Sequence, residues 1–311
     1  MSASTASQNP SRVKQRPGDR IFAGTTRAAA LLILVALAGV AVFLTVQGLP
    51  AFTAPPDALY GAPNFVAFVW PLLFGTLLAA FVALLIATPL SLGVALVISH
   101  YAPRRLAKSV GYLVDLLAAV PSVVYGLWGI GYFGRRLAPG YAWLEAHLGF
   151  IPLFAGPSSA TGKTILTAAI VLAIMAIPII TAITREVFLQ TPKLHEEAAL
   201  ALGATRWEMI RLAVFPYARS GIVSAVMLGL GRALGETMAV AMVLSASGIV
   251  TFNLISSSNP STIAANIALQ FPESTGLKVN ALIASGLVLF VITFVVNFSA
   301  RAIVARGREK A

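Results

Sequence analysis

The sequence TPKLHEEAALALGATRWEMIRLAVFPYARSG, residues 191–221, lies between two strongly apolar stretches and contains several signals for the start and end of helices. Thr191-Pro192 predicts the start of a helix, with a capping hydroxyl followed by a proline in the first turn. Gly203 predicts the end of this helix, because glycine commonly follows a helix C-terminus. We therefore expect this segment to be folded and not a flexible linker.

A second helix is predicted two residues further on. Thr205-Arg206-Trp207-Glu208 has the form of a capping box, in which the threonine and glutamate side chains satisfy backbone N–H groups at a helix start. Pro216 is expected to end this helix just ahead of the next apolar stretch. The first helix has one apolar face, since Leu194, Ala198 and Leu202 recur every four residues. Both helices are expected to lie at a membrane surface.

The composition predicts an integral membrane protein. Of the 311 residues, 58% are hydrophobic and 11% are charged, and the mean hydropathy is +0.86; a soluble domain carries about 25% charged residues. The absence of cysteine excludes a disulfide framework and a thiolate metal site. The three histidines are scattered without ligand spacing, and the apolar stretches contain no recognisable catalytic set, so neither a metal site nor an enzyme activity is expected.

Six apolar stretches are long enough to cross a membrane as helices, which requires about 20 residues each. They are Ala28–Gly48, Leu72–Ile98, Val110–Phe133, Thr164–Ile183, Gly221–Ala246 and Ala281–Ala300. The first is too long for the hydrophobic region of a signal peptide, so we expect an uncleaved anchor. The predicted fold class is an all-α integral membrane protein with six transmembrane helices.

The distribution of Lys and Arg predicts the orientation. Most of the 22 such residues lie in the N-terminal tail, in the loops after spans two and four, and at the C-terminus. The opposite side has only Arg135, Arg136, Lys163 and Lys278. Positive residues concentrate on the cytoplasmic side, so both termini are expected to be cytoplasmic in a plasma (inner) membrane. The same rule accounts for the net charge of +11, and no nucleic-acid partner is expected.

Four segments follow from this layout. Residues 1–27 are expected to be a disordered basic cytoplasmic tail, and residues 28–64 the first transmembrane anchor with an external loop. Residues 65–303 are expected to form the core, with spans two to six and the folded loop 191–219. Residues 304–311 are expected to be a second cytoplasmic tail.

Span five contains an arginine and a glutamate within the sequence GRALGET, residues 231–237. On a continuous helix Arg232 and Glu236 lie on one face, and Arg232 lies near the bilayer midplane, where a charge costs at least about 2.5–3.5 kcal/mol. Gly231 and Gly235 would form a close-packing face beside them. The pair either locks helices together or lines a pathway for an anion, with Glu236 neutralising Arg232 when the pathway is empty. Arginine suits a tetrahedral oxyanion because its planar fork donates parallel hydrogen bonds.

The loop 191–221 resembles the signature loop of ABC importer permeases. The resemblance rests on Glu197-Ala198-Ala199, Gly203 and Pro216 at the spacing of that family, with Ala213 and Phe215 as mild departures. It implies a type I importer permease in which a coupling helix between spans four and five docks on a cytoplasmic ATPase. The coupling residues that this implies are Glu196, Glu197, Ala198, Ala199, Gly203 and Arg206.

Two further stretches, DLLAAVPSVVYGLWG (residues 115–129) and GRALGETMAVAMV (residues 231–243), are similar to the PstC-type permeases of phosphate-specific ABC importers. Ser245-Ala246-Ser247 departs from the family's pattern. The resemblance implies a non-catalytic subunit for phosphate import, surrounded by membrane lipid, with Arg232 and Glu236 in the substrate pathway. Its partners would be a homologous PstA-like permease, a cytoplasmic ATPase dimer that binds ATP and magnesium, and an external phosphate-binding protein.

Two alternatives remain from the sequence. The chain could be an ABC importer permease for phosphonate, sulfate or molybdate, since these importers share the coupling loop. It could also be a stand-alone secondary transporter, although few acidic residues are available for ion coupling. A nucleotide site on this chain is not expected, because GPSSATGKT, residues 156–164, has Pro157 where a phosphate-binding loop uses a backbone N–H donor.

Overall fold

The computed structural model of the protein describes Pro17–Arg308, so residues 1–16 and 309–311 of the two predicted tails lie outside it. The chain divides into two compact units, one ending at Val46 and the other beginning at Gln47. The first unit holds most of helix α1 (Pro17–Gly48). The prediction of a disordered tail up to residue 27 is wrong for its last part, because α1 begins at Pro17 and has Asp19 in its first turn. Both residues favour a helix start.

The described part of the second unit is mostly helical. Its long helices are α2 (Phe65–Leu96), α6 (Ile165–Leu189), α9 (Phe215–Leu234) and α12 (Leu277–Arg308). The shorter helices are α3 (Arg104–Ala118), α4 (Ser122–Trp128), α5 (Gly134–Leu148), α7 (Lys193–Ala201), α8 (Arg206–Met209), α10 (Met238–Val243) and α11 (Ile263–Gln270). The 3-10 turns are η1 (Leu49–Thr53), η2 (Pro56–Leu59) and η6 (Phe271–Glu273), and the π-helical turns are η3 (Val97–Tyr101), η4 (Gly129–Phe133) and η5 (Ile210–Val214).

Five helices of the described chain are long and apolar enough to cross a membrane, and a sixth crossing results if one bent pair counts as a single span. This agrees with the six predicted spans. The bent pair corrects the expectation of a continuous span three, because the helices on either side of residues 119–121 meet at 88°. Pro121 causes the interruption, since it lacks an N–H group and its ring disfavours a helical residue before it. The predicted external loop after this span begins with α5.

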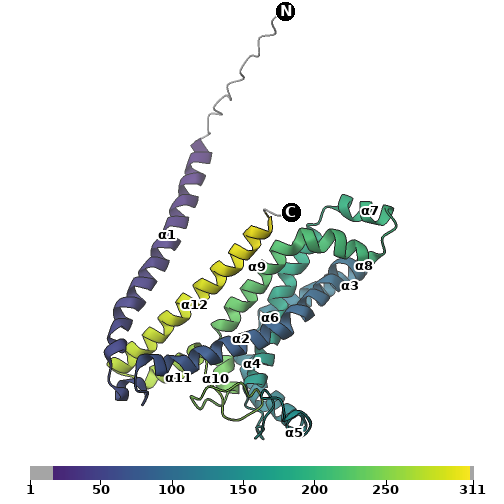
Figure 1. The fold of residues 1–311 in the computed structure, drawn as a ribbon. Helices are drawn as coiled ribbons and strands as arrows, with labels where there is room; N and C mark the ends of the chain where they lie inside the picture. The colour runs from purple at the N-terminus through teal and green to yellow at the C-terminus, as the bar shows by residue number, and fades with distance from the viewer. Residues whose placement is uncertain (1–16, 309–311) are drawn as a thin grey trace, which may run out of the picture. The chain divides into compact units, whose positions relative to one another are not determined.

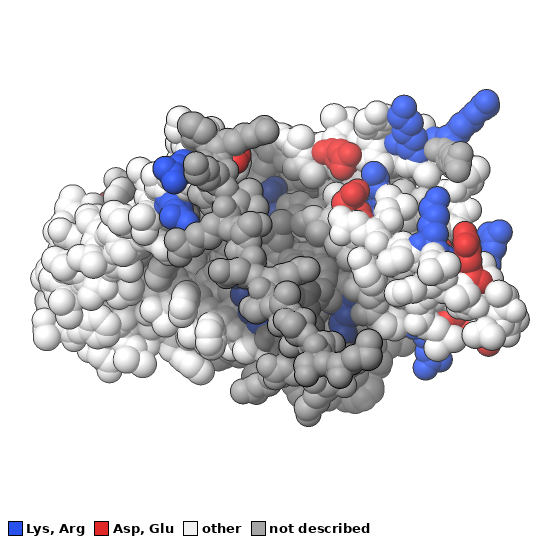
Figure 2. Space-filling view, turned by 90° about the horizontal axis from the view of Figure 1, so that it is seen from above, with Lys and Arg blue, Asp and Glu red and all other residues white. Residues whose placement is uncertain are grey.

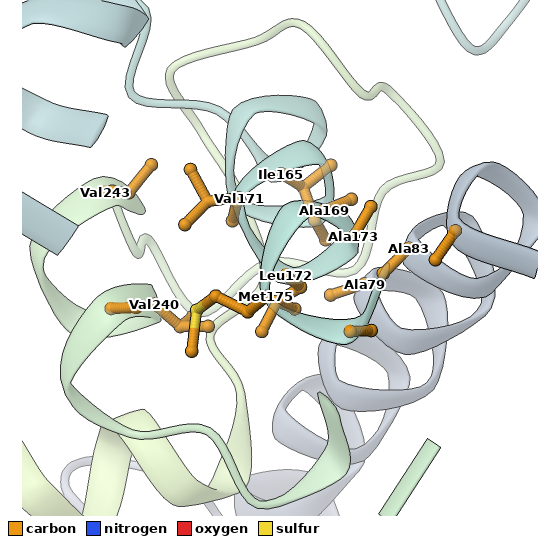
Figure 3. Close-up of a cluster of buried hydrophobic side chains, with 14 of the residues drawn as sticks. Ala79, Ala83, Ile165, Ala169, Val171, Leu172, Ala173, Met175, Val240 and Val243 are labelled. Carbon is orange, nitrogen blue, oxygen red and sulfur yellow. The ribbon is translucent and has the colours of Figure 1, made fainter. Parts of the chain in front are cut away.

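Helix α6 forms the centre of the second unit. It packs against α2, α9, α3 and α10, and 67% of its most apolar stretch is buried, against 22% for α12. Figure 3 shows the main cluster of buried side chains, with Ala169 and Ala173 of α6 facing Ala79 and Ala83 of α2, and with Val240 on the side of α10. Alanines let two helix backbones approach closely, which is the usual basis of helix packing in membranes.

Helices α2 and α6 are also joined by hydroxyl groups near their internal prolines. Ser91 Oγ donates to the Ile177 carbonyl at 3.3 Å, and Thr181 Oγ1 donates to the Ser91 carbonyl at 3.5 Å. Ser91 and Thr181 are fully buried. These two hydrogen bonds therefore tie α2 to α6 close to Pro89 and Pro178.

A polar segment between α10 and α11, residues 244–262, is held against the start of α6 by one buried side chain. Asn259 Oδ1 accepts from the Ile165 N–H at 3.1 Å, and Asn259 Nδ2 donates to the Ser256 and Ser245 carbonyls at 2.9 and 3.2 Å. Directly after this segment, at the start of α11, the Ile263 N–H donates to the Thr76 hydroxyl of α2 at 2.9 Å. Segments far apart in sequence are thereby fixed at one end of the bundle.

The loop 191–221 folds into the two predicted helices, with two differences. Gly203 has φ +86° and separates α7 from α8, and Thr205 with Glu208 forms the predicted capping box. Thr191 does not cap α7: the cap position is Pro192, and the buried Thr191 hydroxyl has no partner among the described residues. Pro216 does not end a helix, because the π-helical turn η5 carries the chain from α8 into α9, where proline occupies the first turn.

The second unit has two distinct ends. Figure 1 shows α7, α8 and the last turns of α12 at one end, and α5, α10 and α11 at the other. In Figure 2, which looks onto the first of these ends, acidic and basic side chains gather toward the right, over α7, α8 and the neighbouring helix ends. The loop that the sequence places in the cytoplasm therefore lies on a charged part of the surface.

The close approach of α2 to the polar segment predicts a difference between two glycines of one helix. Alanine favours a helix over glycine by about 1 kcal/mol, so Gly93→Ala, which no described atom would hinder within 4 Å, should be neutral or stabilising. Gly75→Ala should lower the free energy of unfolding by about 1–3 kcal/mol, because its methyl group would overlap the Ser261 carbonyl. Thermal unfolding in detergent would measure both, and equal midpoints would contradict this packing.

The two threonines before α7 and α8 predict a second difference. Thr205→Val should destabilise the start of α8 by about 1 kcal/mol, because it removes the side-chain cap. Thr191→Val should have little effect, since the Thr191 hydroxyl has no partner in the described part of the chain. Hydrogen exchange of the amides of residues 206–209 would measure the effect. Equal exchange in the two variants would rule out the capping role of Thr205.

Candidate functional site

The GRALGET sequence forms a break between two helices. Helix α9 ends at Leu234, Gly235 caps it with an N–H bond to the Gly231 carbonyl at 3.3 Å, and α10 begins at Met238. The Glu236 side chain is 8% exposed, and its Oε1 atom accepts a hydrogen bond from the Ala239 N–H at 3.1 Å. A carboxylate at this place satisfies a free backbone donor and suits the helix dipole. Glu236 therefore stabilises the start of α10.

The expected pair of Arg232 and Glu236 on one continuous helix is wrong. Residues 235–237 are not helical, and the ion pair found among the described residues joins His100 with Glu196 instead. The physical reason is that a broken helix leaves backbone N–H groups that need a partner inside an apolar region. The Glu236 carboxylate meets that need.

Arg232 lies in the last turn of α9 without a carboxylate partner in the described chain. Its side chain is half-buried, and its Nε atom is buried with no hydrogen-bond partner among the described residues. Tyr125 of α4 lies near it, and the Tyr125 hydroxyl donates to the Leu117 carbonyl at 3.0 Å across the bend between α3 and α4. The two interrupted parts of the bundle therefore come together near Arg232.

The close-packing glycines are not the expected ones. No described atom lies within 4 Å of a methyl group added at Gly231, and at Gly235 such a group would meet only the carbonyl of Gly231. The close contacts of α9 are instead at Gly229, which faces Ile180 of α6, and at Gly221. The face of α9 with Gly229 is thus covered by α6 and does not line a cavity.

An open groove of about 830 Å³ lies along α7, α8, η5 and the start of α9. It is lined by His195, Ala198, Ala199, Leu202, Gly203, Ala204, Glu208, Leu212, Ala213, Pro216 and Tyr217. Its walls are mostly apolar, and Leu202 at its edge is 90% exposed. Such an exposed apolar surface on a charged end of the molecule suits the binding of another protein.

The predicted coupling residues separate into two groups. Ala198, Ala199 and Gly203 line the groove. Glu197 and Arg206 are exposed and do not line it.

Glu196 lies on another side of α7 from the groove. Its Oε1 atom is 3.6 Å from His100 Nε2, at the end of α2. No local pattern points to His100, because it precedes Glu196 by almost a hundred residues and only the fold brings the two together. The same holds for Tyr125 beside Arg232.

Comparison with known sequences identifies relatives along nearly the whole chain. The family model described as "Binding-protein-dependent transport system inner membrane component" matches residues 87–309. The "Phosphate transport system permease protein PstC 2" of Mycobacterium tuberculosis is 46% identical over 300 residues, which cover 93% of this chain and 92% of that protein. The "Phosphate transport system permease protein PstC" of Mesorhizobium japonicum is 40% identical over 304 residues, covering 93% of this chain and 90% of the relative.

A solved structure has a similar fold. The chain resembles one titled "Inward facing conformations of the MetNI methionine ABC transporter", with a TM-score of 0.50 and 18% sequence identity over 76% of this chain and 93% of the other. At this identity the likeness concerns the fold. The family model and the sequence relatives show that the chain belongs to the family of binding-protein-dependent transport system inner membrane components, beside relatives named PstC.

Proposed function

We propose that this chain is a permease subunit of an ATP-driven importer that carries inorganic phosphate across the plasma membrane. The observation that carries the proposal is the 46% identity, over nine-tenths of both chains, to a permease named for phosphate transport. Relatives with this name in other bacteria support phosphate over phosphonate, sulfate or molybdate. Five crossings in the described chain, or six with the bent pair, and no recognisable catalytic set in the sequence fit a membrane subunit that depends on an ATPase for energy.

The complete importer would contain four kinds of subunit. This chain would form half of the translocation pathway and a PstA-like permease the other half. A dimer of cytoplasmic ATPase subunits would bind ATP and magnesium, and an external binding protein would deliver phosphate. With both termini and the loop 191–219 in the cytoplasm, the ATPases would meet the end of the molecule that carries α7 and α8. The charges on that end support this orientation.

The groove along α7, α8 and η5 is the surface we assign to the ATPase. It is lined by Ala198, Ala199 and Gly203, which are small enough to allow close approach of another protein. Exposed Glu197 and Arg206 beside it offer charges for orientation. Because Gly203 lets α7 and α8 meet at a sharp turn, both helices can press on one partner.

Arg232 is the residue we assign to the phosphate pathway. An arginine stays charged, and its five N–H groups match the geometry of phosphate oxygens. Its Nε atom has no partner in the described chain, so the guanidinium is not committed to a carboxylate, and the side chain is only half-buried. Glu236 contributes indirectly. Its carboxylate accepts a hydrogen bond from the Ala239 N–H, which stabilises the break between α9 and α10, and it therefore does not pair with Arg232.

Replacing Arg232 tests the pathway. Arg232→Gln should reduce phosphate uptake by at least about a hundredfold, because two hydrogen bonds between charged groups are lost. Uptake by Arg232→Lys should lie between that of Arg232→Gln and that of the unsubstituted importer, since lysine keeps the charge but lacks the planar guanidinium group. Radiolabelled phosphate uptake by cells that lack other phosphate importers would measure this, with Arg301→Gln on exposed α12 as the matched control. Normal uptake by an assembled Arg232→Gln importer would contradict the assignment.

Replacing Leu202 tests the docking surface. Burial of a leucine side chain contributes about 1.5–3 kcal/mol, so Leu202→Asp should weaken association with the ATPase roughly tenfold or more. Co-purification of the ATPase with this chain would measure the change. Phe150→Asp is the matched control, because Phe150 is 81% exposed and follows α5 at the other end of the bundle. Equal loss of the ATPase in both variants would argue against a specific groove.

A further inference from the structure

The end of the bundle that carries α7 and α8 has its own small core, which we call the Phe188 cluster. Its buried members are Ala95, Leu96, Phe188, Met209, Ile210, Val214 and Ala218. Phe188, at the end of α6, is fully buried and makes edge-to-face contacts with two rings. The ring of His100 lies 6.3 Å from it at 73°, and that of Phe215 lies 5.8 Å from it at 79°. The ends of α2, α6 and α9 are therefore packed together under the two short helices.

His100 is held in one orientation at the end of α2. Its side chain is 9% exposed and lies in the π-helical turn η3. The Ser99 hydroxyl donates to the Ala95 carbonyl at 2.7 Å, and His100 Nδ1 is 2.7 Å from Ser99 Oγ. This contact at Nδ1 fixes the imidazole ring, and the other ring nitrogen, Nε2, faces α7. That atom lies 3.6 Å from Glu196 Oε1.

Glu196 brings α7 into this arrangement. It lies in the first turn of α7, and its side chain is 23% exposed. The pair is attractive when the imidazole carries both protons, and it is the ion pair found in the described part of the chain. Partly buried pairs of this kind are screened less by salt than pairs on an open surface. The groove lies elsewhere on α7, so an ATPase bound there would leave the pair intact.

Helix α7 is thus connected to the membrane helices in two ways. Along the chain, it continues through Gly203, α8 and η5 into α9. Through the contact of Glu196 with His100, it is joined to the end of α2, which is not its neighbour in sequence. Helix α2 in turn contacts the polar segment 244–262 and α11 at its other end, through Gly75 and Thr76. A displacement of α7 can therefore reach the far end of the bundle by way of α2.

We propose that His100 and Glu196 form a coupling contact that transmits movement of the ATPase-bound α7 to α2. His100 is a positioning residue in this role, because it touches neither phosphate nor ATP. The inference rests on the proposed function, since it requires an ATPase on the groove. It adds a second route beside the covalent one through α9, and it assigns to Glu196 a partner within this chain.

The test uses the complete importer in proteoliposomes, with the partner permease, the ATPases and the binding protein. Phosphate uptake and ATP hydrolysis are measured in the same sample. Glu196→Gln, which removes the charge and little else, should lower the phosphate moved per ATP on the order of five- to tenfold, the low end of the range for coupling between sites. His100→Ala should do the same, and the double variant should be no worse than either single one.

The controls distinguish a loss of coupling through His100 and Glu196 from a loss of protein stability, and also from failure of the proposed phosphate import. His147→Ala on exposed α5 should leave the ratio unchanged. An unchanged ratio in assembled Glu196→Gln importers would overturn the proposal, as would additive losses in the double variant. A fall in thermal stability of Glu196→Gln without a change in the ratio would also overturn it, leaving a packing role. If the unsubstituted importer moves no phosphate with ATP, the proposed function fails instead.

Discussion

The hydrogen bond from the Ala239 N–H to the Glu236 carboxylate is the contact on which the centre of this protein depends. A helix that stops within a membrane exposes backbone donors that no lipid can satisfy. Glu236 removes this cost at the start of α10 and is itself stabilised there as a buried acid. The break can then exist, α10 can turn onto α4, and Arg232 is left beside the interruption without an acidic partner in the described chain.

Close packing around α6 allows the broken parts to remain in place. Alanines at the contact of α2 and α6, and glycines where α9 meets α6, bring the backbones together without large side chains. Glycines have the same role in the bent segment: a methyl group at Gly126 would lie 3.0 Å from Ala239 Cα, and one at Gly129 would press on Val243. The rigid part of the bundle thus surrounds the two interruptions, and the less buried helix α12 lies at its side.

Much of this fold could be predicted from sequence, because two of its determinants are local. Transfer of apolar side chains into a membrane identifies the spans, and the chemistry of helix ends identified Gly203 and the Thr205–Glu208 box. The break at Gly235 was missed, since hydropathy counts side chains and not backbone hydrogen bonds. The roles expected of Arg232 and Glu236 as a pair followed from assuming an unbroken helix. His100 could not be found, because only tertiary packing brings it to Glu196.

The π-helical turns have a consequence for the surfaces that the helices present. Such a turn holds one residue more than the corresponding α-helical turn, and one residue corresponds to about 100° around a helix with 3.6 residues per turn. The turn η5 therefore rotates α8 about the common axis relative to α9 without interrupting the rod. Trp207 and Leu212 face the directions they do because of this added residue. A deletion of one residue in 210–214 would shorten the helical segment by one residue and change its hydropathy little, yet it would turn α7 and α8 toward a different side of the molecule.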